Sequence, residues 1–469
     1  MSVEQAEIVV LGLGTGGEDL ASHLVDEGVD VVGVEPNLVG GECAYWACIP
    51  SKIMIRAGNL LAEARRVDGM AGEADVRPDW SPVAERIRVE ATGNWDDSIA
   101  VARFESRGGR FVRGYARMTG PRTVVVGGRQ IEATRGIVLA TGSHPFIPPI
   151  PGLADVKFWT THDAIAADPL PASLIILGGG AVGCELGQVF ARFGVKVTII
   201  EGRDRLLALE EPEASAVLQS VFDREGIAVL TNRRAEHVKQ PGEHIVVTLD
   251  DGSEVSAERL LVATGRSVDF SALGLDAAGL EPVNRHVQVD DLMRAGDGIW
   301  ALGDITGQPM LTSVAVYHSS IIGADILGMS PAPADYRTMP RLTFTDPEIG
   351  TAGLTEAAAR EAGVDVSTIV KQVPATFRGW IHGPGNDGVI KLVAERSSGV
   401  LIGATTMGPR GGDLLGMLGL AIHARLPVET LSRMIYGYPS FYGGIGEAVG
   451  AYGLGIGKVI DPDFVPGLS

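Results

Sequence analysis

The chain has 469 residues, 45% of them hydrophobic, and this length predicts two to four domains that bury a large core. Its 58 acidic and 39 basic side chains leave a formal net charge of −19, which disfavours nucleic acid as a partner. Because no run of 18 apolar residues occurs and only three cysteines are present, we expect a cytoplasmic protein without a membrane span or a secreted disulfide scaffold.

The first predicted element is a strand–helix–strand unit over residues 8–35. No basic leader precedes it, so its short apolar run is interpreted as a strand and not as a signal peptide. In the spacing Gly12-x-Gly14-x-x-Gly17, the glycines permit a tight turn, a close approach to a pyrophosphate, and close packing of helix on strand. Glu35 ends the second strand, where a carboxylate accepts hydrogen bonds from a ribose. The unit predicts a dinucleotide site with phosphates at the helix N-terminus.

The next stretch, GGECAYWACIPSK at residues 40–52, contains Cys43 and Cys48 and allows a metal clip, a structural disulfide or a redox-active pair. A zinc site usually needs four ligands, and neither a second cysteine pair nor a nearby histidine is present. A disulfide across so short a loop restricts the unfolded chain little, and cytosolic reductants oppose it. If the two sulfurs bond, the helix must be irregular between them, because residues five apart in a regular helix lie roughly 8–9 Å apart and a disulfide needs about 7 Å or less. We expect Pro50 to disturb this turn.

A second strand–helix–strand unit repeats the pattern further along the chain. It contains Gly178-x-Gly180-x-x-Gly183 and ends at Glu201, with the same spacing from first glycine to acid as in the first unit (178 to 201, and 12 to 35). Two complete copies predict two bound dinucleotides. A carboxylate at Glu201 binds a free 2′-hydroxyl and repels a 2′-phosphate, which favours NADH over NADPH.

Other residues near these units complete the prediction. Arg203 and Arg205 can hold a 2′-phosphate, so NADPH stays an alternative. Cys184, at the start of a helix, is expected to be a small buried side chain and not a ligand. The stretch IWALGDIT at residues 299–306 is a strand that ends at Asp304, whose carboxylate can accept hydrogen bonds from a polyol.

Together with the strands IVLATGS and LLVATGR and the stretch FTDPEIGTAGLTE at residues 344–356, these motifs resemble the FAD-dependent pyridine nucleotide–disulfide oxidoreductases, such as dihydrolipoamide dehydrogenase, glutathione reductase and mercuric reductase. The resemblance covers essentially the whole chain. It implies an α/β fold with two Rossmann-like dinucleotide-binding domains and an α+β C-terminal dimerisation domain. The implied domains are an FAD domain at 1–150 and 266–335, an NAD(P) domain at 151–265 and a dimerisation domain at 336–469.

The resemblance also assigns residues to the two cofactors by motif position. FAD would contact Gly12, Gly14, Gly17, Glu35, Lys52, Ala116, Gly142, Asp304, Met310, Leu311, Thr312 and Ser313. NAD(P)H would contact Gly178, Gly180, Gly183, Glu201, Ala235 and Gly265.

The activity that the resemblance implies is an electron relay in a homodimer. NAD(P)H reduces the flavin, and the flavin reduces a Cys43–Cys48 disulfide, after which Cys48 is the thiolate against the flavin and Cys43 attacks a small substrate. Lys52 would stabilise the reduced flavin, and its charge would raise the thiolate fraction. Glu185 matches the family's acid near the nicotinamide.

One part of the family pattern is missing. Disulfide-reducing members carry a His-Pro-x-x-x-Glu segment, donated by the partner subunit, in which the histidine protonates the leaving thiol and the glutamate orients it. In YGYPSFYGGIGE, Tyr438 takes the histidine position and Gly443 the glutamate position. A phenol, with a pKa of about 10, is a poor base at neutral pH, so we expect slow turnover of lipoamide or glutathione disulfide. His423 and Glu447 do not fit the spacing.

The electron acceptor therefore stays open. Mercuric reductase has an extra C-terminal cysteine pair, whereas this chain has no cysteine after Cys184. We favour an atypical thiol-disulfide, a thioether or a ketone; an NAD(P)H oxidase, a quinone or metal-ion reductase and a redox sensor are alternatives. No resident metal is predicted. Several aromatic side chains fit a substrate pocket and interface packing equally well: Tyr45, Trp46, Tyr436, Tyr438, Phe441 and Tyr442.

Overall fold

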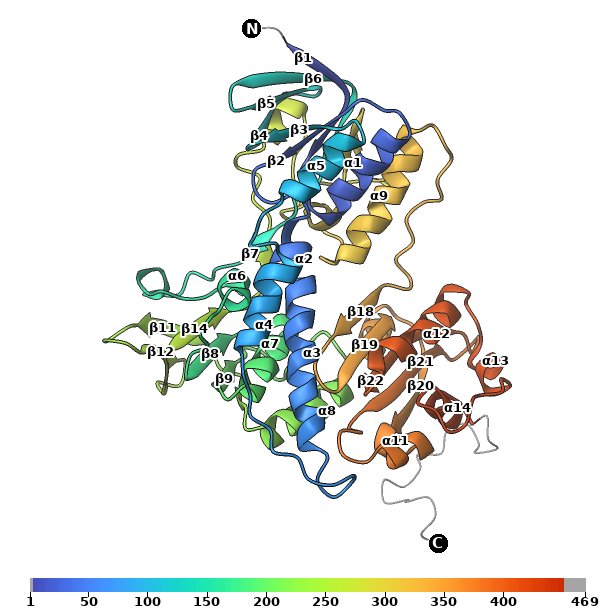
Figure 1. Ribbon diagram of the computed structural model, residues 1–469. Coiled ribbons are helices and arrows are strands. Elements are labelled where there is room, and N and C mark those ends of the chain that lie inside the picture. Colours follow the sequence, from blue (N-terminus) through green and yellow to red (C-terminus); the bar gives the residue numbers. More distant parts are fainter. Residues whose placement is uncertain (1–2, 451–469) are drawn as a thin grey trace.

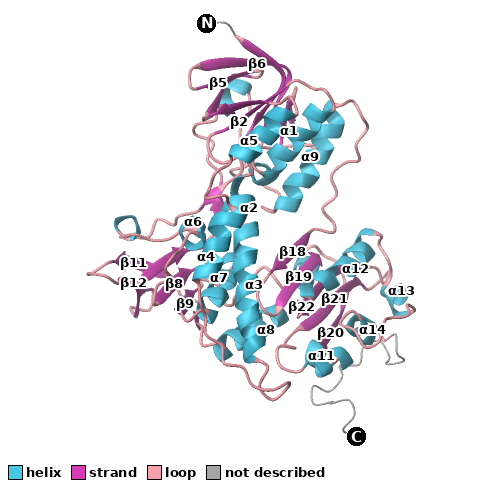
Figure 2. Cartoon of the chain, viewed as in Figure 1, coloured by secondary structure: helices cyan, strands magenta, loops and turns pink. Residues whose placement is uncertain are grey.

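The computed structural model describes residues 3–450, which form three units that each contain a sheet (Figure 1). Within this range no helix is both long enough and apolar enough to cross a membrane. Figure 2 shows helices packed on the sheets of all three units. The mixed α/β fold class is thus confirmed, whereas the domain boundaries stay a prediction.

The first unit is built on an eight-stranded sheet. Its strands are β1 (Glu4–Leu11), β2 (Val31–Glu35), β3 (Arg110–Arg113), β4 (Ala116–Gly120), β5 (Thr123–Val126), β6 (Arg129–Leu139), β16 (Arg294–Gly296) and β17 (Ile299–Ala301). The central strands are parallel, and β17 joins β6, so segments distant in sequence share one sheet. One face is covered by α1 (Thr15–Asp26), α5 (Ser98–Ser106) and α9 (Thr312–Ile326) (Figure 1). Burial on both faces explains why β2 is apolar without alternation.

The second unit contains a four-stranded parallel sheet and a three-stranded antiparallel sheet. The parallel strands are β8 (Ser173–Leu177), β9 (Lys196–Ile200), β10 (Ala228–Leu230) and β14 (Arg259–Val262), and the antiparallel ones are β11 (Ala235–Lys239), β12 (Ile245–Leu249) and β13 (Glu254–Ala257). Its helices are α6 (Thr161–Ile165), α7 (Ala181–Arg192) and α8 (Pro212–Arg224). The chain enters and leaves this unit through β7 (His144–Pro145) and β15 (Arg266–Ser267), which pair with each other.

Two consecutive helices, α2 (Gly41–Tyr45) and α3 (Cys48–Arg65), follow the second strand of the first unit. α3 packs along α7 of the second unit, where Met54 and Val189 share one apolar core. α4 (Ser81–Glu85) and a π-helical turn at Arg86–Ala91 pack beside α3 (Figure 1). The cysteine segment therefore lies where the first two units meet.

The third unit is a five-stranded antiparallel sheet in the order β18-β19-β22-β21-β20. Its strands are β18 (Pro340–Thr343), β19 (Glu348–Gly353), β20 (Val366–Gln372), β21 (Val389–Glu395) and β22 (Leu401–Gly408). α12 (Gly411–His423) packs on β19 and β22. The remaining helices are α10 (Glu356–Glu361), α11 (Phe377–His382), α13 (Val428–Ser432) and α14 (Gly443–Ala448).

Candidate active site

The first glycine loop connects β1 to α1 and leaves room for a ligand at one point only. A Cβ on Gly12 would lie 2.3 Å from the Ala140 carbonyl oxygen, and a Cβ on Gly17 would lie 2.0 Å from that of Gly12. A Cβ on Gly14 would meet no atom within 4 Å. Gly14 is also the N-cap of α1 and offers no side-chain cap, so the helix amides face this open space. The loop fits a pyrophosphate such as that of FAD.

The second glycine loop, between β8 and α7, has the same geometry. A Cβ on Gly178 would lie 2.4 Å from the Ala263 carbonyl oxygen, and a Cβ on Gly183 would lie 2.0 Å from that of Gly178. Gly180, the N-cap of α7, again has open space around its Cβ position. The second loop therefore fits a second dinucleotide as well as the first loop fits FAD.

The two strand-end acids are held in the same way. Glu35 accepts hydrogen bonds from the amides of Leu13 (2.8 Å) and Asn37 (2.9 Å). Glu201 accepts them from Gly179 (2.6 Å) and Arg203 (2.7 Å). Burial raises the pKa of Glu35 despite these two amides. Each carboxylate oxygen keeps a lone pair with which it can accept a ribose hydroxyl.

The remaining predicted cofactor residues are distributed over several loops. Gly142 and Gly265 adopt left-handed backbone conformations, with φ of +65° and +119°. Leu311 caps α9, next to Met310, Thr312 and Ser313. Ala116 begins β4 and Ala235 begins β11. Their cofactor contacts rest on the resemblance and stay a prediction.

The two cysteines are joined in a disulfide, and their Cα atoms lie 4.7 Å apart. This short distance arises because α2 ends at Tyr45 and α3 begins at Cys48, so the predicted interruption of the helix is confirmed. The backbone leaves the helical region at Ala47, with φ −139° and ψ −99°. Pro50 is not the cause, because it lies in the first turn of α3, where proline is tolerated.

Lys52 and Glu185 are brought together across the boundary between the first two units. The Lys52 ammonium lies 2.8 Å from the Glu185 carboxylate, which also accepts a hydrogen bond of 2.8 Å from the Phe344 amide. The ammonium lies 4.5 Å from the centre of the Phe344 ring. One ion pair thus joins α3, α7 and the start of the third unit beside the disulfide. Phe344 was not among the predicted site residues, although it opens the motif FTDPEIG.

A chain of polar contacts begins at Glu42, next to Cys43, and three of its residues, Glu42, His162 and Arg266, were not predicted from the sequence. Its carboxylate lies 2.8 Å from His162 Nε2 and 3.4 Å from the Arg266 guanidinium. Arg266 donates to the Ser143 hydroxyl (2.7 Å), which donates to Asp304 (2.5 Å). Burial favours a raised pKa for Glu42, but the His162 hydrogen bond and Arg266 together hold it below its usual range. Of the residues in this chain of contacts, Asp304 alone was among the predicted site residues.

Tyr438 lies between α13 and α14, which Figure 1 shows well away from α2. Its side chain is 62% exposed, and its ring makes an edge contact with Phe377, with 5.3 Å between ring centres. Gly443 is the first residue of α14. Tyr438 and the disulfide of the same chain are therefore apart, as expected if a partner subunit supplies this segment.

Other residues near the C-terminus have structural partners. Glu447 is buried, lies 3.8 Å from the Lys371 ammonium and accepts a hydrogen bond from the Phe377 amide. The Tyr436 hydroxyl donates to the Leu431 carbonyl within the core of the third unit. Of the aromatic residues that fitted either a substrate pocket or interface packing, Tyr436 is therefore a packing residue.

Two further features lie outside the cluster around the disulfide. Cys184 is fully buried, and its thiol donates to the Gly179 carbonyl, which confirms the predicted buried side chain. Burial strongly raises the pKa of this thiol.

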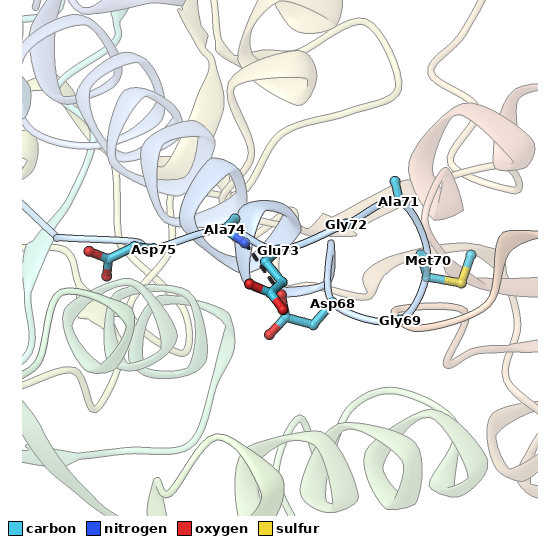
Figure 3. Close-up of a pocket in the computed structure, with 8 residues that line it drawn as sticks. All are labelled: Asp68, Gly69, Met70, Ala71, Gly72, Glu73, Ala74 and Asp75. Carbon is cyan, nitrogen blue, oxygen red and sulfur yellow. Dashed lines mark hydrogen bonds between the residues drawn. The ribbon is translucent and has the colours of Figure 1, made fainter.

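A surface hollow is lined by a single loop, Asp68–Asp75 (Figure 3). Its acidic side chains, Asp68, Glu73 and Asp75, lie beyond the end of α3, and no predicted site residue lines it.

Comparisons with known proteins agree on one family. The model of the pyridine nucleotide-disulphide oxidoreductase family matches residues 6–319, and the model of that family's dimerisation domain matches residues 339–449. The mercuric reductase of Streptomyces lividans is 34% identical over 442 residues, which cover 92% of this chain and 93% of that protein. The dihydrolipoyl dehydrogenase of Haloferax volcanii is 32% identical over 462 residues, which cover 94% and 95%.

Solved structures show the same architecture. LpdA from Mycobacterium tuberculosis has a TM-score of 0.83 and 27% identity, with 96% of this chain and 100% of that chain covered. The HOCl-induced flavoprotein disulfide reductase RclA from Escherichia coli has a TM-score of 0.84 and 24% identity, with 94% and 99% covered. The likeness to RclA concerns the fold alone.

Proposed function

Because the chain belongs to the pyridine nucleotide-disulphide oxidoreductase family, we propose that it passes electrons from NADH through FAD and the Cys43–Cys48 disulfide to a small substrate other than the common disulfides. The observation that carries this proposal is the disulfide itself, formed across the interruption between α2 and α3 and next to the Lys52–Glu185 ion pair. When bound, FAD and NADH supply hydride transfer and two-electron storage.

The chain's own residues would hold these cofactors at two matching loops. The open positions at Gly14 and Gly180 give each pyrophosphate access to a helix N-terminus. The fixed carboxylates of Glu35 and Glu201 would each accept ribose hydroxyls. At Glu201 a 2′-phosphate would meet a negative charge, which is why we favour NADH over NADPH.

Cys48 is placed to be the stabilised thiolate after reduction. It is the first residue of the 18-residue helix α3, where the helix dipole favours a negative charge. The Thr312 hydroxyl lies 3.5 Å from its sulfur and can donate a hydrogen bond to it. Lys52, one turn further along α3, adds a positive charge to the same helix end. Cys43 is then the thiol that attacks the substrate.

The substrate class follows from Tyr438 and Gly443, which replace the expected proton donor and its orienting acid. Without a histidine, the leaving group must be protonated by a weak acid or need no proton, as an atypical disulfide, a thioether or an electrophilic ketone would allow. Mercuric reductases are among the relatives, but the chain's third cysteine, Cys184, is buried in α7 against the second glycine loop and does not provide the extra C-terminal pair. The family's dimerisation domain supports a homodimer in which the partner brings Tyr438 to the disulfide.

The test compares the variant Cys43→Ser with the wild-type protein. We expect anaerobic NADH to give the wild type a long-wavelength thiolate–flavin band, with a weaker response to NADPH. Cys43→Ser should lose turnover with disulfides, thioethers and ketones by at least roughly 1000-fold, because no thiol attacks the substrate. The control His244→Ala, at an exposed histidine just before β12, should keep wild-type turnover.

The same variant separates the alternative function. In an NAD(P)H oxidase, or a quinone or metal-ion reductase, in which the cysteines are secondary, Cys43→Ser would turn over as fast as the wild type. That result, or purified protein that binds no flavin, would contradict the proposal.

A further inference from the structure

Trp46 lies in the interruption between α2 and α3, between the two cysteines in sequence, and stacks on two other rings. Its ring centre is 5.3 Å from that of Trp95, with 17° between the planes, and 4.4 Å from that of His162, with 15° between the planes. We call Trp95, Trp46 and His162 the ring stack. The stack holds the segment whose irregular backbone allows the two cysteines to meet.

Trp95 reaches this stack through an unfavourable backbone. Gly93, Asn94 and Trp95 have φ values of +56°, +60° and +56°, in the left-handed region that residues with a side chain rarely adopt. The Trp95 indole Nε1 is also buried without an acceptor among the described residues. Strain of this kind persists only where surrounding contacts impose it, and it gathers at functional sites. The left-handed backbone at residues 93–95 brings the Trp95 ring into stacking contact with Trp46.

His162 is held at the other ring contact by a hydrogen bond to Glu42. Its Nε2 atom lies 2.8 Å from the carboxylate of Glu42, the residue that directly precedes Cys43, and Arg266 lies 3.4 Å from the same carboxylate. Both ring partners of Trp46 come from outside α2 and α3: Trp95 from the loop before α5, and His162 from α6. The interruption is therefore held from two sides by other parts of the molecule.

We propose that the ring stack is a clamp that keeps the sulfurs of Cys43 and Cys48 close together after the disulfide opens, with Trp46 as the positioning residue. The inference rests on the proposed function, because a clamp matters only if the disulfide opens and closes. Opening breaks the S–S bond, and two electrons and two protons from a dithiol reductant yield two protein thiols while the reductant forms its own disulfide. Holding the thiols close raises their effective concentration, which favours the disulfide and lowers its reduction potential.

The experiment equilibrates the flavin-loaded full-length protein with mixtures of reduced and oxidised dithiothreitol and counts the thiols by alkylation and mass spectrometry. We expect Trp46→Leu to shift the equilibrium toward the dithiol at least tenfold, which corresponds to about 30 mV. Trp46→Phe should keep the dithiol–disulfide equilibrium close to that of the wild type, since it retains an aromatic ring. His162→Leu should shift the equilibrium in the same direction as Trp46→Leu. The control His244→Leu, at an exposed histidine just before β12, should leave it unchanged.

An unchanged equilibrium in Trp46→Leu, or a shift toward the disulfide, would overturn the clamp. If that variant is unfolded, as judged by its thermal unfolding midpoint, Trp95→Leu and His162→Leu carry the same expectation and the same refutation. The measurement uses dithiothreitol and not NADH, so it is independent of the relay. A wild-type disulfide that dithiothreitol reduces but NADH does not would contradict the proposed function and leave the clamp intact.

Discussion

By the resemblance, Tyr438 and Gly443 stand where disulfide-reducing members of the family carry a histidine and a glutamate. Tyr438 is 62% exposed, and Gly443 begins a short helix. A phenol holds its proton at neutral pH, whereas an imidazole can both accept and donate one. We therefore expect the tyrosine at position 438 to limit which leaving groups the site can protonate.

We predict that the double variant Tyr438→His/Gly443→Glu gains lipoamide or glutathione disulfide reductase activity by roughly 100-fold, the lower range for a positioned general acid. Tyr438→His alone should gain less, because nothing orients its ring. Steady-state assays with NADH measure both. A double variant that is folded, dimeric and flavin-loaded yet no faster than wild type would show that the missing dyad is not what limits disulfide turnover.

His318 is a second residue with a testable consequence. It is fully buried in α9; its Nδ1 accepts a hydrogen bond from the Gly303 amide (3.1 Å), and its Nε2 pairs with the Tyr336 hydroxyl (2.8 Å). Burial lowers the pKa of His318 from 6.5 to about 4. Between these pH values the unfolded chain binds a proton that the folded chain does not, so the folded state loses stability as the pH falls.

We therefore predict that this imidazole costs the fold nothing above pH 6.5, and that its cost grows as the pH falls to reach about 3 kcal/mol below pH 4. His318→Gln, which cannot be protonated, should flatten the pH dependence of the urea unfolding midpoint. The exposed His244→Gln should keep the wild-type slope. Equal slopes for His318→Gln and the wild type would show that His318 is not a source of the acid sensitivity.

The two strand–glycine loop–helix elements combine glycines that the fold requires with one glycine that the ligand requires. In the first loop, Gly12 and Gly17 have backbone oxygens within 2.3 Å of where a Cβ would stand, whereas Gly14 has open space. The order of the three glycines is readable in the sequence, but the difference in space around them becomes visible only when strand, helix and neighbouring strand are assembled.

We predict that one alanine variant of this element loses folding stability and that another loses FAD binding. Gly17→Ala should lower the thermal unfolding midpoint of the flavin-free protein, because its Cβ would lie 2.0 Å from the Gly12 oxygen. Gly14→Ala should leave that midpoint unchanged and weaken FAD binding roughly tenfold or more, because the methyl group enters the pyrophosphate space. Gly180→Ala should weaken NADH binding and spare FAD. Full flavin content in Gly14→Ala would refute the placement of FAD at this loop.

Ion pairs between units fix the whole molecule around the site. Lys391, buried in β21, lies 2.8–2.9 Å from carboxylates of Glu211, Glu213 and Glu356, which link the second and third units. Arg192 of α7 lies 2.8 Å from Asp346, just before β19. These contacts hold the third unit against α7 and thus keep Phe344 beside the Lys52–Glu185 pair.

Several large hydrophobic side chains are exposed on the third unit. In the third unit Ile435 is 98% exposed, Leu420 66% and Tyr438 62%, and these lie in the domain that the family uses for dimerisation. We predict that Ile435→Asp weakens the dimer on the order of 100-fold, measured by sedimentation, and that turnover falls with the dimer fraction. Ile99→Asp, on another exposed isoleucine (80%) in α5, should remain dimeric. A monomer with full turnover would refute a site shared between subunits.

The sequence by itself determined the family, the α/β class, both glycine loops and the need for an interrupted helix at the cysteines. These features depend on local spacing, because a turn, a helix start or a short disulfide constrains only residues close in the chain. It also indicated Lys52 and Glu185 separately, by resemblance. Only the tertiary structure decided that these two pair, that the break falls at Ala47 and not at Pro50, and that Trp95 and His162 stack on Trp46. Contacts between residues far apart in the chain arise from how the units pack, and local sequence patterns do not predict them.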